Sequence, residues 1–313
     1  MFAYLLKRLL ATIPVLLVVT IIVFLMLRLT PGDPAANIAG DAATTEDIAK
    51  LREDLGLERP LLVQFAIYAK NLLTGDFGES FYYKRPVISM VADGLEPTLS
   101  LALFTIFLAC LVAVPLGTLA AYRHGSWIDR IVMGFSVVGF SVPVFVIGYV
   151  LIYVLSVKLG WFPVQGYQNI ADGIGGWAYR LILPSTALSV IFIALIARMT
   201  RTSVLEVLNE DYVRTARAKG LPQIKVLMRH ALRNAAVPIV TIIGIAIAIL
   251  ISGVVVTESV FVIPGLGSLT LDAIQGRDYP TVQALIILFS VFYVGINLLI
   301  DVIYTFLDPR IRY

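Results

Sequence analysis

Six predominantly apolar segments recur along this 313-residue chain, and polar segments separate them. The apolar segments cover residues 9–29, 97–121, 131–157, 181–199, 236–257 and 282–306. A helix needs about 20 such residues to cross the hydrocarbon core of a bilayer. The pattern therefore predicts an all-α integral membrane protein with six transmembrane helices.

The composition supports a membrane protein. Hydrophobic residues make up 59% of the chain and charged residues only 14%, whereas soluble domains contain roughly 25% charged residues. The first apolar segment follows Lys7 and Arg8, as in a signal peptide, but it is too long for one and no A-x-A-like cleavage site follows. We interpret residues 1–29 as an N-terminal tail and an uncleaved first transmembrane helix.

Charges are sorted between alternate polar segments. With the N-terminus inside the cell, the inner segments hold fourteen Lys and Arg against five acids, and the outer segments hold fifteen acids against ten basic residues. Loops on the cytoplasmic side carry an excess of Lys and Arg. The sorting predicts cytoplasmic N- and C-termini, a cytoplasmic tail at 308–313 and a long external segment at 30–96.

The external segment is predicted to be partly helical. It begins with the turn sequence TPGDP. Thr44 is a good N-cap for a helix that ends at Gly56, and a second short helix is predicted from Pro60 to about Leu73, before Gly75. Such a segment is either a docking surface for an external partner or a cover over the helices, and the sequence leaves both open.

The polar segment 200–235 is basic and bends at a glycine. Eight Lys and Arg lie between Arg198 and Arg233, and burying each in a bilayer costs about 3 kcal/mol, so this segment lies outside the hydrocarbon. The residues from Ser203 to Lys219 are predicted to form one helix, with Gly220 just beyond its end. Pro222 then begins a second helix at its first position.

The second predicted helix has two faces. Lys225, Arg229 and Arg233 form a basic stripe, which contact with anionic lipid explains. A separate apolar face consists of Ile224, Leu227, Met228, Ala231 and Leu232. Lipid contact does not explain the small residues at the bend, which suit the close approach of another protein. These are Thr215, Ala216, Ala218 and Gly220.

At this segment the sequence resembles a known family. "DYVRTARAKG" followed by "HALRNA" is similar to the cytoplasmic loop of the membrane subunits of ABC importers, in the dipeptide, oligopeptide, glutathione and nickel group. The general signature is Glu-Ala-Ala, three residues, Gly, nine residues, Ile-x-Leu-Pro. Ala216, Gly220 and Leu232 match it, whereas Arg214 and Arg233 replace the Glu and the Pro, which favours the peptide-group form over sugar-type importers.

Further motifs extend the resemblance over nearly the whole chain. They resemble the first of the two permeases of such systems and occur in the same order: TPGDP, GDFG at 75–78, ARMTR at 197–201, PGLG at 264–267, RDYP at 277–280 and the ending DPRIRY. The resemblance implies a type I ABC importer permease fold in a bacterial inner membrane, with a partly helical periplasmic segment at 30–96. It also implies a transmembrane permease core at 97–307 that contains a cytoplasmic coupling elbow at 200–235.

The resemblance also implies partners. These are a second homologous permease subunit, two ATP-binding subunits, a periplasmic solute-binding protein and membrane lipid, without nucleic acid. ATP and Mg²⁺ would be bound by the ATPase subunits, so this chain is expected to be a transport subunit and not an enzyme. The expected contact with an ATPase subunit consists of Tyr212, Arg214, Thr215, Ala216, Arg217, Ala218, Lys219, Gly220 and Leu221.

Other functions have less support in the sequence. There is no GxxxxGK[ST] loop, one cysteine and two histidines, so we expect no cofactor or metal in this chain. A secondary transporter driven by an ion gradient would carry more ionisable groups inside its spans. Asp301 is the clearest such group here. It is expected either to face protein with a cationic or donor partner, such as Arg198 or Arg201, or to lie close enough to the cytoplasmic edge to be hydrated. An intramembrane protease would need a nucleophile and a base at a recognisable spacing. The substrate stays open among dipeptides, oligopeptides, glutathione, opine-like conjugates and chelated nickel.

Overall fold

The computed structural model describes residues 2–29, 35–36, 44–54 and 56–307. Most of these residues are helical, and none of them lies in a named β-strand, which confirms the all-α class. The TPGDP turn at 30–34 and the tail at 308–313 fall outside the described residues.

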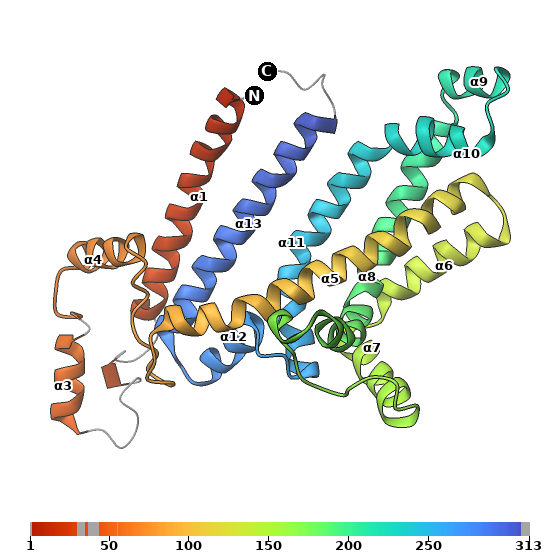
Figure 1. The fold of residues 1–313 in the computed structure, drawn as a ribbon. Helices are drawn as coiled ribbons and strands as arrows, with labels where there is room; N and C mark the ends of the chain where they lie inside the picture. Colours follow the sequence, from red (N-terminus) through yellow and green to blue (C-terminus); the bar gives the residue numbers. More distant parts are fainter. Residues whose placement is uncertain (1, 30–34, 37–43, 55, 308–313) are drawn as a thin grey trace. The chain divides into compact units, whose positions relative to one another are not determined.

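The helices follow one another along the chain as Figure 1 labels them. They are α1 (Phe2–Leu29), α3 (Thr45–Asp54), α4 (Leu61–Leu73), α5 (Val87–Tyr122), α6 (Trp127–Ser141), α7 (Val144–Leu151), α8 (Ile174–Leu208), α9 (Asp211–Ala218), α10 (Gln223–Lys225), α11 (Ala236–Phe261), α12 (Leu266–Gln275) and α13 (Tyr279–Leu307). Two π-helical segments, Ile152–Lys158 and Val226–Leu232, continue α7 and α10, and a short 3₁₀ helix spans Ile170–Asp172.

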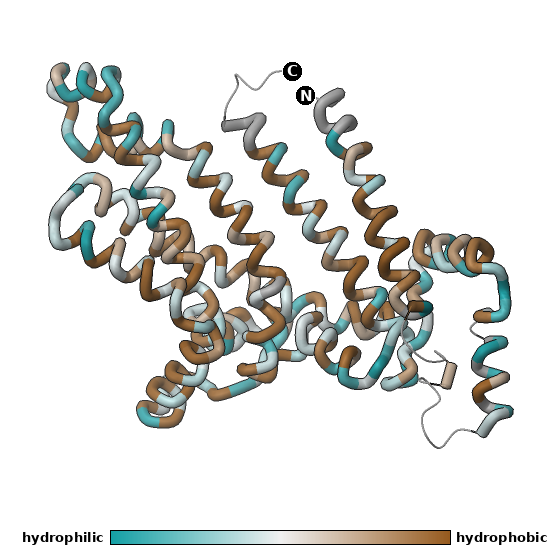
Figure 2. Tube along the Cα trace, turned by 180° about the vertical axis from the view of Figure 1, so that it is seen from behind, coloured by the Kyte–Doolittle hydropathy of each residue, from teal (hydrophilic) through white to brown (hydrophobic). Residues whose placement is uncertain are grey.

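Four helices are each long and apolar enough to cross a membrane, namely α1, α5, α8 and α13. Three bent pairs of helices raise the number of candidate spans to as many as seven, and the six predicted spans fall in this range. Figure 2 shows the hydrophobic colouring along α1 and α13.

The third predicted span, 131–157, is not one straight helix. It breaks between α6 and α7, whose axes are bent by 102°. Pro143 causes the break because it lacks an N–H and disfavours helical backbone in the residue before it. Val142 is extended accordingly, with φ −93° and ψ 123°.

The chain divides into two compact units, which we describe separately. Unit 1 comprises Pro97–Pro264 and Ile296–Tyr313, and unit 2 comprises Phe2–Glu96 and Gly265–Gly295. Helices α5 and α13 contribute to both units.

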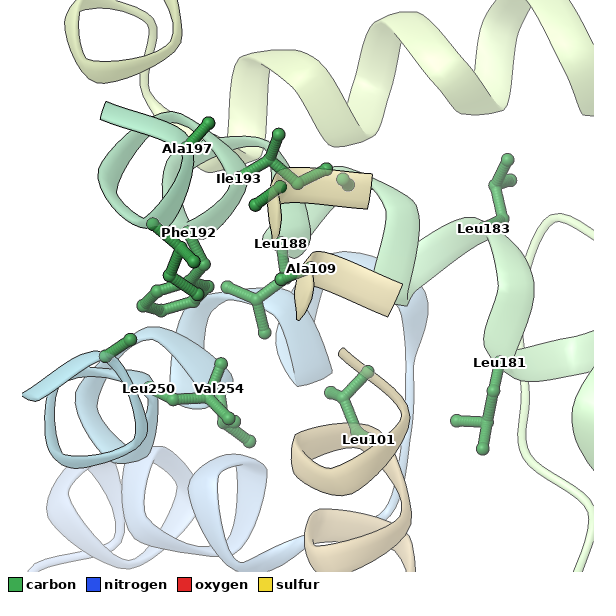
Figure 3. Packing of buried hydrophobic residues seen from close by; sticks show 14 of the residues in the cluster. Leu101, Ala109, Leu181, Leu183, Leu188, Phe192, Ile193, Ala197, Leu250 and Val254 are labelled. Carbon is green, nitrogen blue, oxygen red and sulfur yellow. The ribbon is translucent and has the colours of Figure 1, made fainter. Parts of the chain in front are cut away.

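The core of unit 1 surrounds α8, which is buried along much of its length. Figure 3 shows Phe192 and Leu188 of α8 directed toward Leu250 and Val254 of α11, and all four side chains are buried. At Gly117, α5 and α8 come so close that an added Cβ would lie 2.5 Å from the Ala197 carbonyl oxygen. Small residues allow such close helix contacts in membranes.

Unit 2 contains the two short helices predicted in the external segment. Helix α3 begins directly after Thr44, and α4 spans Leu61–Leu73 directly after Pro60, so both predictions are confirmed. Helix α12 was not predicted. Its Leu266 packs with Val87 of α5 and Leu285 of α13 in the apolar core of this unit.

A buried carboxylate stabilises the turn at residues 79–86 of unit 2. Asp278 accepts hydrogen bonds from Ser80 Oγ at 2.5 Å, Thr281 Oγ1 at 2.6 Å and the Phe81 N–H at 3.1 Å. Asp278, Ser80 and Thr281 are all completely buried. The network therefore joins the turn to the connection between α12 and α13.

Candidate functional site

The basic segment forms an elbow of two short helices, α9 and α10, at one end of α8 and α11 (Figure 1). The prediction of one helix from Ser203 to Lys219 is wrong, because α8 ends at Leu208 and α9 begins at Asp211. Glu210 between them is extended, with φ −70° and ψ 147°. The Asn209 side chain donates to the Leu205 carbonyl oxygen at 3.1 Å, a local bond that competes with helix continuation.

Gly220 ends α9 as predicted. Its φ is +76°, in the left-handed region that favours glycine. The Gly220 N–H donates to the Arg217 carbonyl at 2.9 Å, and the Leu221 N–H donates to the Ala216 carbonyl at 3.4 Å. This is the Schellman pattern of a helix C-terminus. Since nothing lies within 4 Å of an added Cβ, backbone conformation and not crowding selects glycine here.

The second arm differs from its prediction. Pro222 is the N-cap and not the first helical residue, and only Gln223–Lys225 is α-helical before the π-helical segment. The predicted apolar face is confirmed in part: Ala231 is completely buried, and Leu227 and Leu232 pack against the same core. The π-helix changes the register, so Ile224 is 65% exposed and Met228 52% exposed, and Val226, which was not predicted, is completely buried.

The elbow has its own apolar core. It includes Val213 and Ala216 of α9, Val226 and Ala231 of the second arm, and Val204 of α8. Ala216 is only 6% exposed, so the prediction that it contacts a partner directly needs correction. Its small side chain lets α9 pack on the second arm.

The other predicted contact residues lie at the surface of the elbow. Leu221 is half-buried, and the exposed ones are Tyr212, Arg214, Thr215, Arg217, Ala218, Lys219 and Gly220. The nearest acid, Asp211, lies 3.4 Å from the Arg214 guanidinium, and both side chains are largely exposed. Figure 2 shows α9 mostly in the hydrophilic colour.

Tyr212 connects the two arms of the elbow. It is 43% exposed, and its side chain is hydrogen-bonded to Asn234. Burial of part of the ring raises the pKa of Tyr212 above its usual value. The Asn234 side chain also donates to the His230 carbonyl at 2.7 Å, so Tyr212 is linked through this amide to the second arm.

An ion pair that the sequence did not reveal lies next to the elbow. Arg201 of α8 binds both carboxylate oxygens of Asp129 in α6, through Nε to Oδ1 and through Nη2 to Oδ2 at 2.8 Å. The Gly125 N–H donates to the same carboxylate at 2.9 Å. The Asp129 side chain is 6% exposed. The bidentate pair fixes the turn between α5 and α6 to α8.

The sequence contains a local signal for Asp129 but none for its partner. Ser126 caps α6 by accepting from the Asp129 N–H, in the Ser-x-x-Asp spacing of a helix start. Its partner Arg201 is 72 residues away along the chain. His124 completes the cluster, with Nδ1 2.9 Å from Arg201 Nη2 and 3.2 Å from Asp129 Oδ2.

The structure revises the expected partners of Asp301. Arg201 pairs with Asp129, and the guanidinium of Arg198 lies 5.6 Å from the centre of the Phe140 ring. Asp301 itself is 6% exposed, which agrees with its expected position inside the protein. Its role stays a prediction.

The two turns that charge sorting placed on one side of the membrane lie at the same end of unit 1. Ala121, at the end of α5, packs in the elbow core with Val204 and Val213. At the opposite end of α8, the Gly166 N–H donates to the Phe261 carbonyl of α11 at 2.9 Å. The alternation of segments within this unit therefore follows the predicted order.

Comparison with known proteins gives two family matches. Residues 113–313 match the family "binding-protein-dependent transport system inner membrane component", and residues 1–102 match its N-terminal family model. In fold, the chain is similar to the MetNI methionine ABC transporter in an inward-facing conformation, with a TM-score of 0.59 over 71% of this chain and 97% of that chain, at 19% identity.

Curated relatives match the full length. A probable peptide ABC transporter permease of Sinorhizobium fredii is 53% identical over 99% of both chains. A putative peptide transport system permease of Brucella abortus is 44% identical over 100% of both chains. The glutathione transport system permease GsiC of Salmonella typhi is 45% identical over 100% of both. With matches that cover both its core and its N-terminal segment, the chain belongs to the inner membrane component family of binding-protein-dependent transport systems.

Proposed function

We propose that this chain is a permease subunit of an ATP-driven importer and forms half of the path for peptides or similar small solutes. The family membership and the names of full-length relatives support a permease. The observation that carries the proposal is the elbow, an exposed cationic structure that packs against the ends of α5 and α8. A surface of this kind suits docking of a cytoplasmic subunit that supplies energy.

The proposal includes the other subunits and the cell compartment. A second homologous permease completes the path, two ATPase subunits bind ATP and Mg²⁺, and a periplasmic binding protein delivers the solute. The chain itself holds no cofactor and catalyses no reaction. It lies in a bacterial inner membrane, with both termini and the elbow in the cytoplasm.

The elbow surface resembles a protein interface in its chemistry. Aromatic residues, Met and Arg are enriched at interfaces and supply most of the binding energy. Here Tyr212 and Met228 are exposed apolar anchors, together with Ile224. The exposed Arg217 and Lys219 supply charge-assisted hydrogen bonds at the rim.

The docking test must separate contact with a partner from packing inside the elbow. Ala216→Trp would disrupt the elbow core, because Ala216 is buried. Ala218→Trp is the better variant, since Ala218 lies two residues further along α9 and is exposed. The matched control neutralises the basic stripe by Lys225→Gln and Arg229→Gln, which we assign to lipid contact.

The assembled transporter is purified with each variant. We expect Ala218→Trp to release the ATPase subunit or to uncouple ATP hydrolysis from solute uptake by at least tenfold, the loss typical of a disturbed interface centre. We expect the control variant to retain the ATPase subunit and the coupling of ATP hydrolysis to solute uptake. A wild-type content of ATPase subunits and full coupling in Ala218→Trp would remove the elbow as the docking site.

The energy source is tested separately in cells or vesicles. An ionophore that dissipates ion gradients, with ATP maintained, should leave uptake intact. Loss of uptake under these conditions would favour the alternative, a secondary transporter driven by an ion gradient.

A further inference from the structure

Two adjoining cavities lie in unit 2, beside the C-terminal end of α1. Their volumes are about 370 Å³ and 230 Å³, and Arg28, Ile67, Tyr68 and Asn71 line both of them. The larger volume falls in the usual range of small-molecule sites. These cavities are not part of the elbow, and the larger one is bordered by Glu79 and Phe81 of the turn at 79–86.

The smaller cavity is cationic. Its lining adds Arg59, Gln64 and Gly56 to the shared residues, and in the part of the chain that the structure describes no acid lines it. Two arginines, Arg28 and the exposed Arg59, therefore line one small space. Cations in a partly enclosed site are stabilised by an anion.

Arg28 is half-buried and is held by neutral groups. Its Nε donates to Gln64 Oε1 at 2.8 Å, and its Nη1 donates to the Phe24 carbonyl at 3.0 Å. The guanidinium carbon also lies 3.7 Å from the centre of the Phe24 ring. These contacts orient the cation, and among the residues that the structure describes they include no carboxylate partner.

Tyr68 supplies a hydrogen-bond donor. Its hydroxyl is buried, and none of the described residues bonds to it. Burial raises the pKa of Tyr68 to about 12, so the hydroxyl keeps its proton at neutral pH. Buried polar groups nearly always have a partner, and a ligand anion that accepts this proton would provide it.

The local fold holds the cationic residues in place. Gln64 Nε2 donates to the carbonyls of Leu57 at 3.1 Å and Arg59 at 2.7 Å, which fixes the turn before α4. Phe24 packs against Phe65, with ring centroids 5.2 Å apart, and fixes α4 to the end of α1. The cavity walls are therefore defined before any ligand binds.

The position of the cavities relative to a bilayer follows from α1 and α4. The apolar part of α1 spans Arg8–Met26, so Arg28 lies where this helix leaves the hydrocarbon. The short apolar helix α4 exposes Leu62 at 83% and Leu73 at 88%. An exposed apolar helix beside the end of a span is typical of the membrane interface. The cavities consequently lie at the depth of lipid headgroups.

We propose that these cavities bind a phosphate group, held by Arg28, Arg59 and the Tyr68 hydroxyl. Arginine and phosphate form paired, charge-assisted hydrogen bonds. A phospholipid headgroup and free phosphate share this chemistry, and the exposed apolar face of α4 favours the phospholipid. Asp76 and Glu79 line the larger cavity, which suits the ammonium of phosphatidylethanolamine.

A simpler interpretation is that Arg28 contacts any lipid non-specifically, as span-end arginines do. The two interpretations predict different results for variants of residues that line the cavity but do not contact the bilayer. Tyr68→Phe removes only a hydroxyl that bonds to no described residue, so this variant should fold. Arg59→Gln removes the second cation. Lys70→Gln is the matched control, because Lys70 is exposed on the same helix and lines neither cavity.

The full-length chain is delipidated in detergent and titrated with phosphatidylethanolamine, with bound lipid counted by native mass spectrometry. We expect Tyr68→Phe and Arg59→Gln each to weaken binding about tenfold, as loss of a hydrogen bond to a charged group does. We expect Lys70→Gln to bind like the wild type. Diacylglycerol, which lacks the phosphate, should not occupy the site.

Two results would overturn the site. One is equal binding by the wild type and both cavity variants, and the other is binding of diacylglycerol as tight as that of phosphatidylethanolamine. A parallel titration with inorganic phosphate, read as thermal stabilisation, distinguishes the sources. If inorganic phosphate stabilises the wild type but not Tyr68→Phe, and phosphatidylethanolamine does not bind the wild type, the phosphate site stands. Its ligand is then the free ion.

Discussion

At the scale of single residues, Gly117 shows how a missing side chain sets a helix contact. An alanine Cβ there would lie 2.5 Å from the Ala197 carbonyl oxygen and 2.7 Å from Thr200 Cβ, closer than van der Waals contact allows. We predict that Gly117→Ala costs about 1–3 kcal/mol of stability, the usual result of overpacking. Gly134→Ala in α6 is the control, since nothing lies within 4 Å of its Cβ. Thermal unfolding in detergent gives the melting temperature of each variant. Equal melting temperatures for Gly117→Ala and Gly134→Ala would contradict the close contact.

The pair of Asp129 and Arg201 supports a second prediction at this scale. The two side chains are 6% and 16% exposed, so removal of one charge leaves the other poorly compensated. We expect Asp129→Asn to cost about 3–5 kcal/mol. Asp211→Asn removes the exposed pair with Arg214, and we expect no measurable change because solvent screens such pairs. The comparison uses the same thermal unfolding assay, and a stable Asp129→Asn would show that the pair contributes little.

At the scale of elements, the turn at 79–86 depends on one carboxylate from another part of unit 2. Asp278→Ala would leave the Ser80 hydroxyl, the Thr281 hydroxyl and one backbone N–H without their acceptor. Each buried donor left unpaired costs about 1–3 kcal/mol, so we predict a clear fall in melting temperature and faster proteolysis within the turn.

Tyr83→Phe is the matched control for this turn. The Tyr83 hydroxyl bonds to Asp272 at 3.2 Å, but in an exposed position where water replaces the partner. We expect its melting temperature and proteolysis to match the wild type. If Asp278→Ala also resists proteolysis like the wild type, apolar packing and not the carboxylate network holds the turn.

Elements that end on local signals were predictable from the sequence. The helix start after Thr44, the start after Pro60 and the Schellman glycine at Gly220 each depend on a few neighbouring residues. The break after Leu208 had only the Asn209 side chain as a local signal. The π-helical register of Val226–Leu232 was not predictable, because it accompanies packing of the elbow core. Hence the bend at Gly220 was placed correctly along the chain, while the inward position of Ala216 was missed.

Long-range pairs were also outside the reach of sequence reasoning. Arg201 was expected near Asp301, and nothing in one sequence connects it with a carboxylate 72 residues away. The cavities in unit 2 depend in the same way on Arg28 meeting Gln64, 36 residues further along the chain. Apolar periodicity predicts which segments cross the membrane, but it does not predict which polar side chains meet.

At the scale of the whole molecule, orientation in the membrane follows from charge and can be tested with single cysteines. The basic elbow and the turn after α5 lie at one end of unit 1, where an excess of Lys and Arg predicts the cytoplasm. Ser80 and Ser203 are 0% and 3% exposed, so cysteines at these positions would be shielded from a reagent. Labelling therefore needs exposed positions.

Thr74 and Thr202 form a matched pair for this test. Both are exposed, and each hydroxyl donates to the carbonyl four residues earlier, Lys70 or Arg198, at 3.2 Å and 3.1 Å. In a Cys110→Ala background, we expect an impermeant thiol reagent to label Thr74→Cys in intact cells and Thr202→Cys only after permeabilisation. The reverse pattern would invert the orientation and place the elbow outside the cell. An ATPase that binds the elbow from the cytoplasm would then be excluded, because the positive-inside rule and the docking proposal require the same side of the membrane.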